Sequence, residues 1–190
     1  MFWFKYIPDY KGEKVILYTG RVAKEKDLDV FIEVAERFEN NKDVKFVIVG
    51  DGPYKKEIQH RAKNVVFTGY LEGEELSKAY ASSFLFLFPS TTETFGNVVL
   101  EALASGLPVL VSDKGAAKEN VISGVNGFVV KNNDVNEYTN LINRFLDNRE
   151  LYESIQNSAV KLIRSLDYEK LLKNMINEFS LGAIKKRRWL

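Results

Sequence analysis

Six short apolar runs recur along the chain, each bounded by Gly, Pro or Asp. They hold Val, Ile and Phe at successive positions and do not alternate with polar residues. This pattern is typical of strands that are covered on both faces, as in a parallel sheet. The expected strands are VILYTG (15–20), VKFVIVG (44–50), NVVFTG (64–69), FLFLFP (84–89), PVLVSD (108–113) and GFVV (127–130).

Segments of helical period lie between these runs. Apolar stripes at helical spacing are formed by Leu28, Phe31, Ala35 and Phe38, and by Leu76, Ala79 and Tyr80. Pro53 suits the first turn of a helix, and NVVLEALASG is expected to be a helix that ends on Gly106. An Asn-Gly turn at 126–127 should lead into the last strand. The alternation predicts an α/β fold with a single Rossmann-like, doubly wound parallel sheet of about six strands.

The chain from Asp134 onward shows helical period only, so helices should follow the sheet. Asp134 and Asp167 are the expected N-caps. The apolar positions are Tyr138, Leu141, Ile142, Phe145, Leu151, Ile155, Ala159, Leu162, Leu171, Leu172, Met175 and Phe179. The final KKRRWL reads as a solvated basic tail, with membrane-surface or partner docking as the alternative. We therefore divide the chain into an extension (1–13), a Rossmann-like domain (14–180) and a basic tail (181–190).

Composition narrows the class of protein. With 45% hydrophobic and 28% charged residues, the 190-residue chain has the composition of a soluble globular domain. There is no cysteine, and His60 is the single histidine, so a thiolate or multi-histidine metal site is excluded. A net charge of +1 does not predict a nucleic-acid partner. The longest apolar run is too short for a membrane span, and the start is too short for a signal peptide. We expect a cytoplasmic location, with peripheral association at the inner membrane face as an option.

Candidate chemistry was sought after each strand, because ligands of open parallel sheets bind beyond the carboxyl ends. After the first strand, Arg21 and Lys26 follow Gly20. A forked guanidinium and an ammonium near a helix N-terminus suit a diphosphate. The alternative is a solvated loop, since Lys24, Glu25 and Lys26 alternate in sign.

The second strand is followed by GDGP (50–53), which lacks the third glycine of a dinucleotide-binding loop. The sequence also has no Gly-Lys-Ser/Thr phosphate loop. Nicotinamide binding and ATP hydrolysis therefore lose support. We interpret GDGP as a turn with close backbone packing.

The fourth strand leads to ETFGNVVLE (93–101), in which two acids bracket the start of a helix. The free backbone amides there would form an anion site, while a carboxylate suits sugar hydroxyls and a ribose diol. Alternatively, Glu93 offsets the helix dipole and Glu101 is a surface residue. Apolar neighbours surround Glu101 in the sequence, which favours a position facing a cleft. The amides in question belong to Phe95, Gly96, Asn97 and Val98.

Taken in order, these motifs resemble a known family. The motifs are GR with Lys after four intervening residues, FVIVGDGP, VVFTGYL, FLFPSTTETFGNVVLEALASGLPVLVSD and GVNGFVV. They are similar to the C-terminal half of family 4 retaining glycosyltransferases of the GT-B fold. The resemblance covers residues 14–180. It implies a domain that binds a nucleoside-diphosphate sugar, either a UDP-sugar or a GDP-sugar, with no further cofactor and no metal.

The resemblance also implies roles at matching positions. Arg21 and Lys26 would bind the donor diphosphate, and Glu93 would hold hydroxyls of the transferred sugar. Glu101 would hold the ribose diol, and the Leu71 backbone would meet the base. The amides of residues 95–98 would contact sugar and phosphate, and SLDYEKL near Asp167 would begin a helix that crosses to the other half of the enzyme.

Two departures from the family pattern stand out. Asp27 replaces a glycine, which places an anion near the phosphate site, although Asp27 could instead cap the following helix. The family's Gly-Gly-x-Pro-Glu is GAAKE here, so only Gly115 and Glu119 match. We regard Glu119 as a weak candidate with a structural role.

The family requires two Rossmann-like halves, and only 1–13 precede the first expected strand. We expect this chain to be one half of a longer enzyme, or to receive its acceptor-binding half from a partner chain, and to be inactive alone. MFWFKYIPDY would then be interdomain linker with apolar surface. The alternative function is a non-catalytic nucleotide-sugar-binding or regulatory module. A flavodoxin-like or response-regulator domain is disfavoured, because no acidic cluster follows the first strand.

Overall fold

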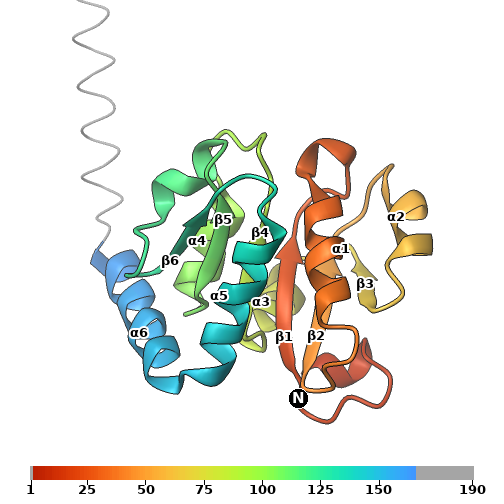
Figure 1. Cartoon of the computed structure of the whole chain (residues 1–190), viewed down its shortest axis with the longest axis horizontal. Coiled ribbons are helices and arrows are strands. Elements are labelled where there is room, and N and C mark those ends of the chain that lie inside the picture. The colour runs from red at the N-terminus through yellow and green to blue at the C-terminus, as the bar shows by residue number, and fades with distance from the viewer. Residues whose placement is uncertain (1, 166–190) are drawn as a thin grey trace, which may run out of the picture.

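A computed structural model of the chain describes residues 2–165. Its centre is a six-stranded, wholly parallel sheet with the order β3-β2-β1-β4-β5-β6 (Figure 1). The strands are β1 (Lys14–Thr19), β2 (Val44–Val49), β3 (Val65–Gly69), β4 (Leu85–Phe88), β5 (Val109–Ser112) and β6 (Gly127–Val130). The predicted Rossmann-like fold and the expected strands are confirmed.

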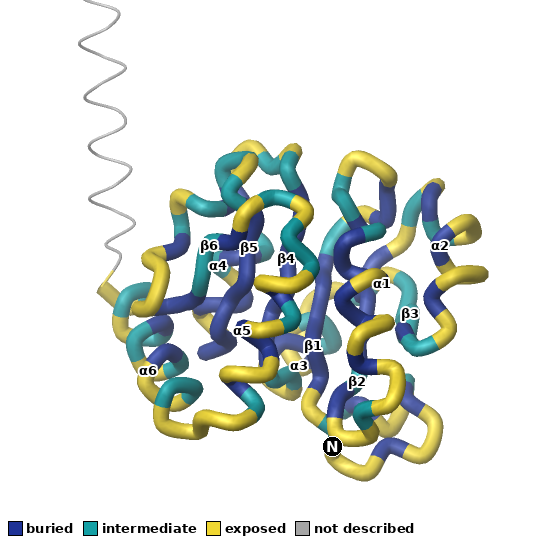
Figure 2. Tube along the Cα trace, in the orientation of Figure 1, coloured by how far each residue is buried: buried dark blue, intermediate teal, exposed yellow. Residues whose placement is uncertain are grey.

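The continuous apolar runs are explained by burial on both faces. Every residue of β4 and β5 is buried, and the tube in Figure 2 is dark along the middle of the sheet. Aromatic rings fill the layer beside β1 and β4, where Tyr18 stacks on Phe88 with 5.6 Å between ring centroids. Burying such side chains contributes about 1.5–3 kcal/mol each, so these runs have little freedom to shift register.

Helices cover both faces of the sheet. In Figure 1, α1 and α5 lie side by side in front of it, while α3 and α4 lie behind. The last described helix, α6, packs on α4 and α5. The helices are α1 (Leu28–Arg37), α2 (Lys55–Arg61), α3 (Gly73–Ala81), α4 (Asn97–Ala104), α5 (Val135–Asp147) and α6 (Arg149–Ser165), with 3-10 turns η1 (Phe2–Lys5), η2 (Lys24–Lys26) and η3 (Ala116–Asn120).

Helix boundaries follow the local signals at Asp134 and Gly106 and depart from them at Pro53. Asp134 caps α5 by accepting a hydrogen bond from the Glu137 amide, and Gly106 after α4 has φ +78°, as a C-terminal glycine requires. Pro53 instead lies in a turn before α2, which begins at Lys55. Asn126 ends the turn that leads into β6, as predicted, and its buried side chain bonds the loop backbone.

The segment before β1 packs on the domain. The Trp3 side chain is buried, and its indole nitrogen donates to the Ser82 carbonyl at the end of α3. The Tyr6 hydroxyl and the Lys5 ammonium both contact Glu75 of α3. The proposed division at 13/14 remains a prediction. The expected cap Asp167, the stripe at 171–179 and the tail at 181–190 lie outside the described residues.

The order in which the strands follow one another across the sheet reverses at the boundary between β1 and β4. After β1 it builds β2 and β3 on one side, and then returns to place β4 on the other side. Only Ile16↔Leu85 and Leu17↔Phe86 pair β1 with β4, whereas β1 and β2 pair along the whole strand. A crevice at such a switch point is where open α/β sheets bind ligands.

Candidate functional site

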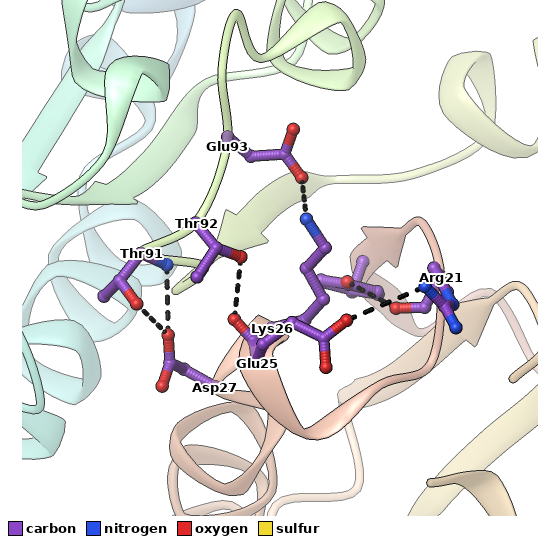
Figure 3. Close-up of polar contacts among 8 residues, drawn as sticks. Arg21, Glu25, Lys26, Asp27, Thr91, Thr92 and Glu93 are labelled. Atoms are coloured by element: carbon purple, nitrogen blue, oxygen red, sulfur yellow. Dashed lines mark hydrogen bonds and ion pairs between the residues drawn. The ribbon is translucent and has the colours of Figure 1, made fainter. Parts of the chain in front are cut away.

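Side-chain contacts join the loops that follow β1 and β4. The Asp27 carboxylate accepts hydrogen bonds from the Thr91 amide at 3.0 Å and from the Thr91 hydroxyl at 2.6 Å (Figure 3). The Thr92 hydroxyl donates to the Glu25 carbonyl at 2.9 Å. We call these four residues the loop clasp. It holds the neighbouring residues of both loops, Lys26 and Glu93, next to each other.

Asp27 therefore does something other than cap a helix. It stands at the N-cap position of α1, but its side chain makes no capping hydrogen bond, so that expectation was wrong. Its φ of +52° lies in the left-handed region, where glycine is unstrained and aspartate is tolerated better than most residues. One oxygen of the carboxylate placed there accepts both hydrogen bonds from Thr91, so it is engaged by neutral donors within the protein.

Lys26 and Glu93 form an ion pair in the space above the clasp. The Lys26 Nζ lies 2.6 Å from Glu93 Oε1, and the two side chains are 16% and 23% exposed. A charge-assisted contact of this length holds both groups in one geometry. The ammonium could donate to anionic ligand oxygens and the carboxylate could accept from ligand hydroxyls. Glu93 therefore binds Lys26, whereas the alternative interpretation gave it only the role of offsetting the α4 dipole.

Arg21 is placed differently from Lys26. Its guanidinium is 66% exposed and lies 3.8 Å from the Glu25 carboxylate, a contact that solvent weakens. Its carbonyl accepts a hydrogen bond from the buried Tyr18 hydroxyl, which supports the start of the loop. Burial, together with the carboxylates of Glu93, Glu25 and Asp27, raises the pKa of Tyr18, so this donor remains protonated.

A cleft of about 460 Å³ opens beside the switch point. It collects predicted site residues from separate loops, because its walls come from the ends of β1, β2 and β3 and from α3 and α4. Those residues are Gly20, Arg21, Leu71, Val98 and Glu101. Glu101 is exposed on its outer side but lines this cleft, as the apolar neighbours in the sequence suggested.

Two buried hydroxyl groups fix the position of the Glu101 carboxylate, one by bonding it directly and the other by bonding the first. The Tyr80 hydroxyl donates to Glu101 Oε2 at 2.9 Å, and it lies 2.6 Å from the Thr19 hydroxyl. Tyr80 and Thr19 are almost wholly buried. Burial raises the pKa of Tyr80, which keeps the phenol neutral.

The start of α4 offers amides to the site. Gly96 adopts φ +79°, and a Cβ there would lie 2.9 Å from the Ala117 Cα, so the position requires glycine. Within residues 2–165, the Asn97 and Val98 amides have no backbone acceptor, and no side chain caps the helix. Phe95 and Asn97 line a shallower depression next to Glu101, outside the main cleft. The predicted residues are thus split between the cleft, the ion pair and this rim.

The two weaker motifs have structural roles. A Cβ on Gly50 would lie 1.9 Å from the Gly20 carbonyl and one on Gly52 would lie 2.3 Å from the Val22 carbonyl. GDGP is therefore a close-packed turn, as predicted. Gly115 lies against Thr91 in the same way, with 2.8 Å from an added Cβ to the Thr91 carbonyl oxygen, while Glu119 is exposed on η3.

Sequence reasoning missed the supporting residues. Thr91 and Thr92 belong to the motif that precedes α4, but the sequence predicts no role for them there. Thr19 is predicted only as a residue of the strand 15–20. Tyr80 was assigned to an apolar stripe, which its ring satisfies. Its hydroxyl was the available signal, since a buried phenol on a helix next to the sheet end needs a polar partner.

The structure also bears on metal binding and on membrane-spanning helices. Within residues 2–165, no three or more His, Cys, Asp and Glu side chains are grouped so as to hold a metal ion. Across the same residues, no helix is both long and apolar enough to cross a membrane.

The sequence of the chain is similar to those of known proteins. The sequence model of the family described as "Glycosyl transferases group 1" matches residues 2–162. The chain is 33% identical over 175 residues to sulfoquinovosyl transferase SQD2 of Arabidopsis thaliana, covering 90% of this chain and 34% of that protein. It is 38% identical over 119 residues to a GDP-mannose-dependent alpha-mannosyltransferase of Corynebacterium glutamicum, covering 63% and 28% respectively.

The fold comparison finds the same architecture in a solved structure. HepE of Anabaena, solved in complex with UDP and glucose, superimposes with a TM-score of 0.77 over 89% of this chain and 48% of its own, at 24% identity, a likeness of fold. The chain spans under half the length of each of these three proteins. With its six-stranded Rossmann-like sheet, this chain belongs to the group 1 glycosyl transferases and fits the C-terminal domain of their GT-B fold.

Proposed function

We propose that this domain binds a nucleoside-diphosphate sugar and serves as the donor half of a glycosyltransferase that transfers the sugar with retention. One observation carries the proposal: the cleft, the Lys26–Glu93 pair and the uncapped start of α4 all lie at the carboxyl ends of the strands around the switch point of the sheet. Cations, free amides and carboxylates are the groups that diphosphate, ribose and sugar hydroxyls require.

The donor can be assigned to the site in three parts. The nucleoside enters the cleft, with the base at the Leu71 backbone and the ribose diol on Glu101. The diphosphate lies along Gly20 and Arg21, and meets the amides of Asn97 and Val98 together with Lys26. The transferred sugar lies at Glu93, with the Phe95 and Gly96 backbone beside it.

The nucleotide is a UDP or GDP species in this proposal. HepE is described with UDP and glucose, and the name of the mannosyltransferase specifies GDP-mannose. Both relatives support a nucleotide sugar and neither decides between the bases.

The Lys26–Glu93 pair has to separate when a donor binds. Lys26 exchanges the Glu93 carboxylate for diphosphate oxygens, and Glu93 becomes free to accept hydrogen bonds from sugar hydroxyls. During transfer, negative charge builds up on the departing diphosphate, and Arg21, Lys26 and the α4 amides stabilise it. Neither acid acts as a free-standing acid/base pair. A second domain brings the acceptor and closes over the site to exclude water.

The binding claim is tested by calorimetric titration of UDP, GDP, UDP-glucose and GDP-mannose into the 190-residue chain. We expect at least one of them to bind, and Lys26→Ala to weaken that binding. Lys42→Ala is the matched control, because Lys42 lies at the opposite, amino end of the sheet. Absence of binding by all four ligands, or equal loss in the two variants, would overturn the proposal.

The half-enzyme claim needs a separate measurement. Sugar transfer and donor hydrolysis by the purified chain are followed by release of the nucleoside diphosphate. We expect little turnover without a second domain, and the product formed by the two-domain enzyme should keep the anomeric configuration of the donor by NMR. Robust transfer by the chain alone would contradict the need for a second half.

A further inference from the structure

Three hydroxyl-bearing and acidic groups form a row that runs from the sheet into the cleft. The Thr19 hydroxyl, at the end of β1, lies 2.6 Å from the Tyr80 hydroxyl on α3, and the latter lies 2.9 Å from Glu101 Oε2 on α4. Thr19 and Tyr80 are 3% and 2% exposed. The Tyr80 hydroxyl therefore links β1, α3 and α4, and it also lies 3.4 Å from the Val98 carbonyl of α4.

The hydrogen bonds in this row have one workable direction. A carboxylate can only accept, so Tyr80 donates to Glu101, and Thr19 then donates to the phenol oxygen. Hydrogen bonds in such a chain strengthen one another. Because burial raises the pKa of Tyr80, its proton stays in place across the physiological range.

The two oxygens of the Glu101 carboxylate therefore have different surroundings. Oε2 is engaged by Tyr80, whereas no contact within residues 2–165 is recorded for Oε1. A surface glutamate normally samples several rotamers, and fixing it costs side-chain entropy of up to about 2 kcal/mol. Here a buried neutral donor holds the carboxylate before any ligand arrives, so ligand hydroxyls meet an acceptor already in position.

We infer that the Thr19–Tyr80–Glu101 row makes the site select ribonucleotide donors over 2′-deoxyribonucleotide donors. The inference rests on the proposed function, since it places the ribose at Glu101. Tyr80 and Thr19 are positioning residues: they touch Glu101 and each other, and Glu101 touches the sugar. A neutral phenol suits this task, because it orients the carboxylate without a counter-charge that the hydroxyls would have to displace.

The experiment measures the affinity of the 190-residue chain for UDP and GDP and for their 2′-deoxy analogues. For the wild type we expect the ribonucleotide to bind about tenfold more tightly, the effect of one hydrogen bond to a charged group. Tyr80→Phe should reduce that ratio to about twofold or less, mainly by weakening ribonucleotide binding. Thr19→Val should reduce it in the same direction and by less.

Tyr152→Phe is the matched control. The Tyr152 hydroxyl also donates a hydrogen bond, to the Phe84 carbonyl just before β4 and away from the cleft. Its removal should leave the ribose-to-deoxyribose ratio unchanged. Thermal midpoints of all variants are recorded, since a folding defect in Tyr80→Phe would weaken both analogues equally and leave the ratio intact.

The outcomes separate the two proposals. If neither UDP nor GDP binds the wild type, the proposed function fails and this inference fails with it. If ribonucleotides bind and the ratio is the same in wild type and Tyr80→Phe, the function stands and the inference is overturned. A wild type that binds both analogues equally also overturns it.

Discussion

The two acids of the ETFGNVVLE motif are held by opposite means. Glu93 is fixed by a charged partner, with Lys26 Nζ 2.6 Å away, whereas Glu101 is fixed by the neutral phenol of Tyr80 at 2.9 Å. The ion pair engages the Lys26 ammonium and one oxygen of the Glu93 carboxylate with each other. The phenol occupies one carboxylate oxygen and leaves the other for a ligand.

The difference shows what each side of the site must do on binding. On the Glu93 side a ligand has to replace a contact, so part of its binding energy goes into separating two charges. On the Glu101 side a ligand adds to a contact that persists. We therefore expect the nucleoside end to bind with little rearrangement, and the diphosphate and sugar end to rearrange. The variants below test this contrast.

Lys26→Ala should have the largest effect on nucleoside-diphosphate affinity. It removes a charge-assisted donor and leaves the Glu93 anion facing the phosphates, so we expect a loss of about thirtyfold, or about 2 kcal/mol. The double variant Lys26→Ala/Glu93→Gln should recover part of that loss, by an amount that differs from the gain caused by Glu93→Gln when Lys26 is present, as measured by calorimetry. Simple additivity of the two changes would contradict the ion pair as the connecting element.

Asp27→Gly probes the loop clasp on which the pair depends. Glycine relieves the left-handed backbone but removes both hydrogen bonds to Thr91, so we expect the free energy of unfolding to fall by about 1–2 kcal/mol. Urea denaturation measures the change. Thr91→Val, which removes only the hydroxyl bond, should cost less. An Asp27→Gly variant as stable as wild type would show that the clasp contributes nothing.

Glu93→Gln should change affinity in opposite directions for two ligands. Without the carboxylate, Lys26 is free, so plain UDP or GDP should bind about threefold to fivefold more tightly, the effect of a partly exposed ion pair worth up to about 1 kcal/mol. The advantage of the sugar nucleotide over the plain diphosphate should shrink. Glu101→Gln should weaken both ligands equally, and a matching response at Glu93 would remove the contrast between the two acids.

Tyr138→Phe provides the smallest expected effect. The Tyr138 hydroxyl is buried on α5 and has no hydrogen-bond partner within residues 2–165, unlike that of Tyr80. Removing it should leave ribonucleotide selectivity unchanged and raise the unfolding free energy by about 0.5 kcal/mol, because an unpaired buried hydroxyl is costly. A loss of stability on this substitution would show that the hydroxyl has a partner after all.

Local rules accounted for much of the fold. Continuous apolar runs identified the strands, and the loops after β1 and β4 could be selected because ligands bind beyond carboxyl strand ends. Arg21, Lys26, Glu93 and Glu101 were named on that basis, and their roles remain proposals. Gly106 and Asp134 marked helix ends by simple backbone rules.

The remaining features depend on contacts between distant parts of the chain. No local pattern pairs Asp27 with Thr91, so the aspartate was interpreted from its immediate neighbours as a helix cap. Tyr80 has one apolar ring and one polar atom, and periodicity registers only the ring. Asn126-Gly127 marked the turn into β6, but the local pattern gave no sign that the Asn126 side chain is buried and bonded to the loop backbone.

The short pairing of β1 with β4 has a consequence for the order of folding. Each βαβ unit closes over a short stretch of chain, while the Ile16↔Leu85 and Leu17↔Phe86 pairs close over a much longer one and incur a larger loop entropy. We expect the β1–β4 junction to form last, with amide protection at Phe86 appearing after that of β2 during refolding in pulse-labelled exchange. A bound nucleoside-diphosphate sugar that bridges the β1 and β4 loops would then slow unfolding, because the junction it spans would be the first to open.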